Sequence, residues 1–99
     1  MAQTYRTIDA VRKTVEILEY LASQKEPVTG SDVARSVSLP KGTVMCHLIT
    51  LEETKLVRRV GDGYELGMGA ALLWARKKAL LEGTRERAER ELSALEGGM

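Results

Sequence analysis

The chain has 99 residues, 43% of them hydrophobic and 29% charged, and its formal net charge is +1. This length supports one domain with a modest core, or one domain with an appended helix, and the composition is ordinary for a globular protein. No run of about 18 apolar residues is present and the start lacks the apolar segment of a signal peptide, so we expect a cytoplasmic protein without membrane contact. The single cysteine, Cys46, excludes an internal disulfide and fits that location.

The first predicted element is an amphipathic helix that begins near Asp9 and ends near Ala22. Ile17 and Tyr20 widen its apolar stripe beyond what one small core needs. We therefore expect Ile17 and Tyr20 to contact a second protein surface. The stripe itself recurs at three- and four-residue spacing, which places its members on one side of the helix: Val11, Val15, Leu18 and Leu21.

A short helix and a longer helix follow, joined by the tight link Ser38-Leu39. Thr29 and Asp32 approximate a capping box at the start of the short helix. The longer helix is predicted over about residues 40–53, because a proline suits a first helical turn. Val44, Leu48 and Leu51 then recur at helical spacing and form its predicted buried stripe. Two helices joined in this way form a helix-turn-helix, and the second one, small at its exposed start, suits a DNA major groove.

Residues 56–66 are predicted to form a β-hairpin. A strand over 56–60 and a returning strand over 64–66 flank the turn Gly61-Asp62-Gly63. A helix-turn-helix followed by a hairpin is a winged helix. The sequence therefore predicts a mainly α fold with a small β-hairpin wing, occupying residues 8–67 as a DNA-binding domain.

Residues 68–99 are predicted to form a C-terminal helical extension. Residues 70–75 are apolar nearly all round the helix, and a small winged helix cannot bury such a segment alone. We therefore expect a homodimer held by the extension and the first helix. Gly83 followed by Thr84 leaves open whether residues 68–95 form one kinked helix or two. The predicted dimerisation residues are Ile17, Tyr20, Leu72, Leu73 and Trp74.

Residues 8–69 resemble the N-terminal DNA-binding domain of the IclR (isocitrate lyase regulator) transcription factors. In such regulators a larger effector-binding domain follows the DNA-binding one. This chain ends about where that domain would begin, so we expect either a stand-alone regulator without small-molecule control or a fragment. The resemblance lies in the order and spacing of several short segments: Asp32-Val33-Ala34, Leu39-Pro40-Lys41, Thr43-Val44, Leu51-Glu52-Glu53 and Tyr64-Glu65-Leu66-Gly67.

The predicted function is sequence-specific binding of double-stranded DNA by a transcriptional regulator. Lys41 and the N–H groups at the start of the longer helix would hold phosphates. Thr43, Met45 and Cys46 on the exposed face of that helix would meet base edges or thymine methyl groups, and Gly42 is also a predicted DNA-binding residue. Arg58 and Arg59 in the wing would reach phosphate or the minor groove. A symmetric dimer predicts an inverted-repeat operator with half-sites about one helical turn apart, or a multiple of it.

Catalysis has little support in the sequence. The only histidine, His47, adjoins Cys46, so on a helix the two side chains point about 100° apart and cannot act as a nucleophile–base pair. No metal-ligand motif is present, and we expect no enzyme activity, metal or cofactor.

An alternative function remains open: an interaction module that kept the winged-helix shape and pairs with or antagonises another regulator. Gly42 and Cys46 stand where the IclR family usually has Ser and Arg, and they remove hydrogen-bond donors from the DNA-facing surface. The low net charge favours the same reading.

Overall fold

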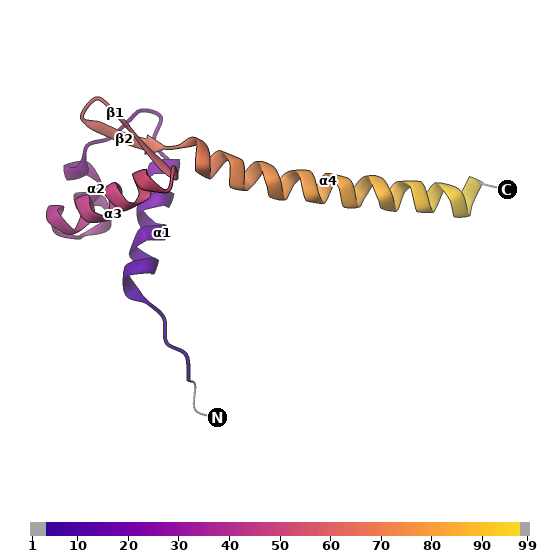
Figure 1. The fold of residues 1–99 in the computed structure, drawn as a ribbon, viewed down its shortest axis with the longest axis horizontal. Helices are drawn as coiled ribbons and strands as arrows, with labels where there is room; N and C mark the ends of the chain where they lie inside the picture. Colours follow the sequence, from indigo (N-terminus) through magenta and orange to yellow (C-terminus); the bar gives the residue numbers. More distant parts are fainter. Residues whose placement is uncertain (1–3, 98–99) are drawn as a thin grey trace.

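The computed structural model describes residues 4–97, and Figure 1 shows a small body from which one long helix extends. The predicted mainly α winged helix-turn-helix with a helical extension is confirmed. Residues 98–99 of the predicted extension lie outside the described residues. The elements, in chain order, are α1 (Asp9–Ala22), α2 (Gly30–Val37), α3 (Lys41–Glu53), β1 (Val57–Val60), β2 (Gly63–Leu66) and α4 (Met68–Gly97).

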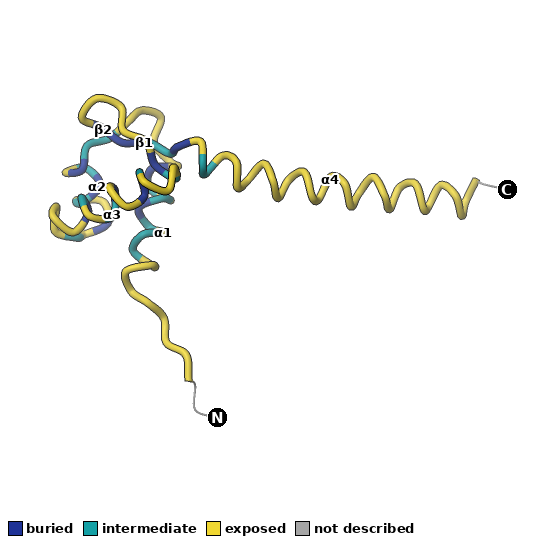
Figure 2. Tube along the Cα trace, in the orientation of Figure 1, coloured by how far each residue is buried: buried dark blue, intermediate teal, exposed yellow. Residues whose placement is uncertain are grey.

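The core of the body forms where the first three helices meet the hairpin. Within residues 4–97, α4 contributes no buried residue, and Figure 2 shows it exposed along nearly its whole length. The winged helix therefore builds its core without the extension. The buried residues, which include the predicted α3 stripe, are Ile17, Leu21, Val33, Val37, Val44, Leu48, Leu51, Val57 and Tyr64.

The predicted buried stripe of α1 is confirmed at its C-terminal end, where Leu21 is buried and Leu18 is half buried, and is wrong at its start. Ile17 is 0% exposed, whereas Val11 is 56% and Val15 is 48% exposed. Both sets of apolar residues have helical spacing, so periodicity alone cannot choose between them. The structure packs the Ile17 and Leu21 side against α2 and β2. Ile17 is therefore a core residue and not a dimerisation residue, while the half-buried Tyr20 packs at the edge of the core.

The start of α2 carries the predicted capping box. The Asp32 N–H donates to Thr29 Oγ1 (3.2 Å), and the Thr29 N–H donates to Asp32 Oδ2 (3.3 Å). These hydrogen bonds, with the nearby Arg35 guanidinium, hold the pKa of Asp32 below its usual value. Because the folded-state pKa is lowered, the stabilisation by the ionised carboxylate is present at neutral pH and is lost as the pH falls through that lowered pKa.

We expect Thr29→Ala to lower the free energy of unfolding by about 1 kcal/mol at neutral pH, since it removes an N-cap acceptor. Urea denaturation followed by circular dichroism measures this value. Ser31→Ala is the matched control, because Ser31 is exposed in the same turn and surface changes usually stay within about 0.5 kcal/mol. Equal stability of the two variants would contradict the capping role.

The hairpin pairs β1 with β2 antiparallel, and Arg58 lies opposite Glu65 while Arg59 lies opposite Tyr64. The turn is shorter than predicted, because Gly63 already belongs to β2 and only Gly61 and Asp62 turn the chain. Gly61 takes a positive φ of 62°, which suits a glycine. Val28 forms an isolated β-bridge beside β2 by exchanging two backbone hydrogen bonds with Tyr64 (3.0 and 2.7 Å).

The junction between the body and α4 is built around the backbone of Lys55. Lys55 has the left-handed φ of 69° that ends the turn after α3. The Gly67 N–H donates to the Leu56 oxygen and the Gly69 N–H to the Lys55 oxygen, both at 2.8 Å. A Cβ at Gly67 would lie 2.5 Å from the Lys55 oxygen, and one at Gly69 would lie 2.6 Å from it. Only glycine fits at either position.

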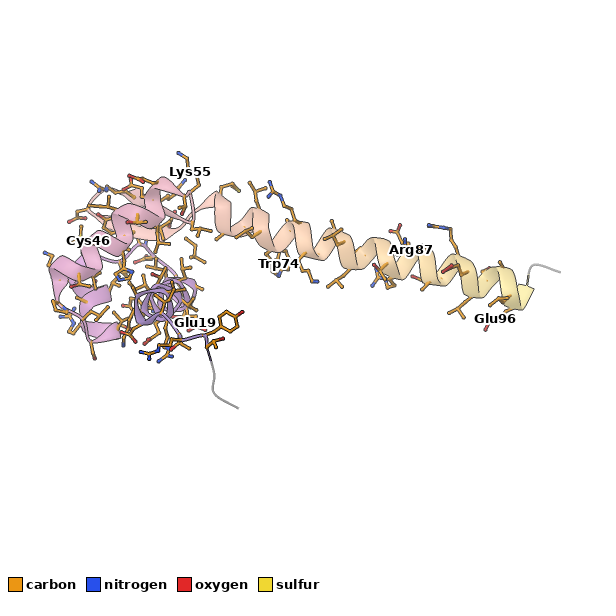
Figure 3. The ribbon with its side chains drawn as sticks, turned by 60° about the horizontal axis from the view of Figure 1, so that its bottom comes forward. Glu19, Cys46, Lys55, Trp74, Arg87 and Glu96 are labelled. Carbon is orange, nitrogen blue, oxygen red and sulfur yellow. The ribbon has the colours of Figure 1, made fainter. Side chains whose placement is uncertain are left out.

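The extension is one continuous helix of 30 residues, so the alternative that Gly83 left open is settled. Its first half exposes large apolar side chains: Leu72 is 48%, Leu73 is 56% and Trp74 is 67% exposed. Trp74 and Glu96 lie on the same side of the helix (Figure 3). Within the described residues, no helix is both long and apolar enough to cross a membrane.

Candidate nucleic-acid interface

The exposed face of α3 begins with small side chains. Pro40 is the N-cap and no side chain caps the helix, so the N–H groups of its first turn have no acceptor inside the helix. Lys41, Gly42 and Thr43 are exposed at this start, and Cys46 follows one turn later. Hydrogen-bond donors and a close approach to the backbone are therefore available at one end of α3.

A groove separates the start of α3 from the wing. Lys41 and Arg59 are its cationic members, and Asp62 at the wing tip is an acidic one. Met45 lines the groove and is half buried, packing against α2 near Gly30. The groove has a volume of about 490 Å³ and is lined by Thr29, Gly30, Ser31, Lys41, Met45, Arg59, Gly61, Asp62 and Tyr64.

The two wing arginines lie on opposite faces of β1, as strand alternation requires. Arg58 is on the outer face, where its Nε donates to Glu65 Oε2 at 2.7 Å. Arg59 is on the α3 side, with a guanidinium nitrogen 3.4 Å from Glu52 Oε1 and its Cζ 5.4 Å from the centre of the Tyr64 ring. Only Arg59 therefore lies beside Lys41 in the groove.

The pairing of both arginines with carboxylates was missed at the sequence level. The antiparallel register that places Arg58 opposite Glu65 follows from the short turn. The sequence does not reveal the Arg59–Glu52 pair, because it depends on the angle between the wing and α3. Both pairs reduce the free positive charge of the wing.

His47 joins α3 to α1. Thr14 Oγ1 lies 2.8 Å from the Ala10 carbonyl oxygen and shares a hydrogen bond of 2.8 Å with His47 Nδ1. His47 is thus an interhelical contact of the body. No group of three potential metal ligands occurs among residues 4–97.

Comparison with known proteins gives two matches. The model of the IclR helix-turn-helix domain matches residues 10–61, just over half of the chain. The crystal structure of the Agobacterium tumefaciens repressor BlcR is similar with a TM-score of 0.62 and 30% identity, covering 72% of this chain and 29% of the BlcR chain. A comparison with curated proteins found no match. The chain therefore belongs to the family of IclR helix-turn-helix domains, which are DNA-binding parts of transcription regulators.

Proposed function

We propose that this chain is a sequence-specific DNA-binding transcription regulator that binds an inverted-repeat operator as a homodimer. In this proposal residues 8–67 are the DNA-binding domain and residues 68–97 are the dimerisation element. α3 enters the major groove with Gly42, Thr43 and Cys46 toward the base edges. Lys41 holds a phosphate together with the N–H groups at the helix start.

The observation that carries the proposal is the surface at the start of α3. Exposed small residues, unpaired helix-start N–H groups and Lys41 occur together there, and Arg59 faces the same groove. A phosphate is bound by hydrogen-bond donors and positive charge. The base edges are reached by a helix whose small side chains allow a close approach in the major groove. The similar BlcR structure is described as a repressor, which supports a regulatory role for this chain.

A gel shift with random duplex DNA at increasing salt tests DNA binding. For a protein that contacts phosphates, the logarithm of the binding constant falls linearly with the logarithm of the salt concentration, by roughly 0.9 per phosphate contact. Selection of bound sequences from the random pool then gives the operator, which we expect to be an inverted repeat. Affinity that does not change with salt would contradict the proposal.

We expect Arg59→Ala to weaken binding to all duplexes about equally and to reduce the salt slope by about 1, because Arg59 faces the Lys41 groove. Arg58→Ala is the matched control, since Arg58 is its neighbour in sequence but lies on the outer face in a pair with Glu65. Salt-dependent gel shifts of both variants measure the difference. A larger loss for Arg58→Ala would mean that the outer face of the wing approaches the DNA.

Exposed apolar surface supports the homodimer part of the proposal. Val11 and Val15 on α1, with the N-cap residue Ile8 (66% exposed), form an outward stripe, and we propose this stripe for the interface in place of Ile17. On α4, Leu72, Leu73 and Trp74 are exposed. A two-fold dimer covers the same surface on both copies. Light scattering at micromolar concentration tests this, and a monomer would contradict it.

A second candidate function, an interaction module that antagonises another regulator, is favoured by the ion pairs of the wing. Glu65 and Glu52 offset Arg58 and Arg59, and the chain carries a formal net charge of only +1. Such a module would form a dimer but show no salt-dependent affinity for DNA. The gel shift and light scattering together separate the two functions.

A further inference from the structure

One seam of side chains runs along α4 from its first turns almost to its end. Its positions alternate by three and four residues, which is the seven-residue repeat of a two-stranded coiled coil. All of them are exposed in the structure. Leu72, Leu73 and Leu80 lie off this seam and widen the apolar surface only in the first half of the helix. The seam consists of Ala71, Trp74, Lys78, Leu81, Arg85, Ala88, Leu92 and Leu95.

A parallel, in-register pair of α4 helices fits this seam poorly. Each seam residue would then meet its own copy. Lys78 would face Lys78 and Arg85 would face Arg85 in the middle of the interface, where like charges destabilise it. Trp74 would meet a second Trp74, while the alanine layers would leave gaps that a packed interface does not tolerate.

An antiparallel pair fits the same seam well. One alignment of the two antiparallel helices places small residues opposite large ones. The same alignment places each cation opposite an apolar residue of the other copy. Outside the seam, Lys77 comes beside Glu91 of the other copy, which gives an opposite-charge pair on each side. Symmetry repeats every layer twice. The layers are Ala71 with Leu95, Trp74 with Leu92, Lys78 with Ala88, and Leu81 with Arg85.

In the single chain, the charged ends of Lys78 and Arg85 already point away from the seam, toward its edges. Lys78 Nζ lies 4.0 Å from Glu82 Oε2 and 5.3 Å from the centre of the Trp74 ring. Arg85 Nε lies 3.6 Å from Glu89 Oε1. The aliphatic stems can therefore stay in the seam while the charges remain in water. Near the two-fold axis, the Glu82 side chains of the two copies approach each other. Lys78 beside each Glu82 offsets the repulsion between the two negative charges.

We infer that a second copy of this chain packs its α4 antiparallel along this seam, with the two-fold axis level with Gly83. The inference rests on the proposed homodimer and specifies its geometry. The two bodies then lie at opposite ends of the paired helices. In this register Gly69 of one copy lies level with Gly97 of the other, so the two points where α4 leaves its body are roughly 42 Å apart along the paired helices, at 1.5 Å per residue.

Disulfide trapping in the full chain tests the register. Cys46→Ser removes the only cysteine, and in that background Lys78→Cys and Ala88→Cys are made as separate proteins. After mixing and mild oxidation, we expect the disulfide joining the two variants to exceed either self-disulfide roughly tenfold, because a disulfide needs Cβ atoms about 4 Å apart. Peptide mass spectrometry identifies the linked chains.

Arg76→Cys mixed with Arg90→Cys is the matched control, because these positions lie at equivalent levels in the same register but on the side of α4 away from the seam. We expect little disulfide between them. Self-disulfides of Lys78→Cys and Ala88→Cys as the main products would show a parallel pair and overturn the inference. So would a dimer by light scattering that forms no seam disulfide at all. A monomer would contradict the homodimer as well, whereas DNA binding is scored separately in the gel shift.

Discussion

Changing Leu73 and Trp74 together to glutamate should convert the protein to monomers and weaken operator binding by roughly 10²–10⁴-fold, which is the range lost when two linked sites no longer bind together. Both side chains are large and exposed, at 56% and 67%. Dimerisation would have to bury the new carboxylates without partners, at a cost of several kcal/mol. The double change removes apolar surface from two neighbouring sides of α4, so the expected result does not depend on the register of the pair.

Light scattering and gel shifts on the same samples measure the two effects. Arg87→Gln with Arg90→Gln is the control, because it also lowers the net charge by two but changes side chains that are already polar. Any general repulsion from DNA therefore acts on both variants. A Leu73→Glu, Trp74→Glu protein that stays dimeric would exclude the first half of α4 from the interface.

The second large effect is expected at Ile17. Ile17→Ala should lower the free energy of unfolding by about 2–5 kcal/mol, because it leaves a cavity where a fully buried side chain stood. Such a loss is a large part of the stability of a small domain. Urea denaturation at one fixed protein concentration measures it, since the stability of a dimer depends on concentration.

Val15→Ala is the matched control on the same helix. Val15 is 48% exposed on the outward stripe of α1, so its replacement should change unfolding much less and should instead weaken dimerisation. The opposite result, a large stability loss at Val15 and a small one at Ile17, would mean that the buried and outward faces of α1 are exchanged.

The order of elements could be predicted from the sequence because each has a local cause. The Thr29–Asp32 capping box starts α2, and Val44, Leu48 and Leu51 fix the buried side of α3. Lys55 takes the left-handed backbone that commonly follows a helix end, although it is not a glycine. Each of these features depends on residues a few positions apart in the chain, so the spacing of those residues in the sequence is enough to predict it.

Features that depend on packing between elements could not be predicted. α1 has apolar residues on two sides, and only contact with α2 and β2 decides that Ile17 is buried and Val11 is not. Likewise, sequence alternation separates Arg58 from Arg59, but the Arg59–Glu52 pair requires the angle between the wing and α3. The positions and roles of the DNA-contacting residues stay predictions for the same reason.

The Lys55 junction connects the start of α4 directly to the end of α3. Its two backbone hydrogen bonds end on Leu56 and Lys55, which directly follow the C-cap of α3 at Thr54. Gly67 and Gly69 come so close to the Lys55 oxygen that a Cβ on either would lie 2.5 or 2.6 Å from it. The direction of α4 is therefore fixed relative to the end of α3. In the proposed DNA complex, the angle at which α3 enters the major groove would follow the direction of this helix of 30 residues.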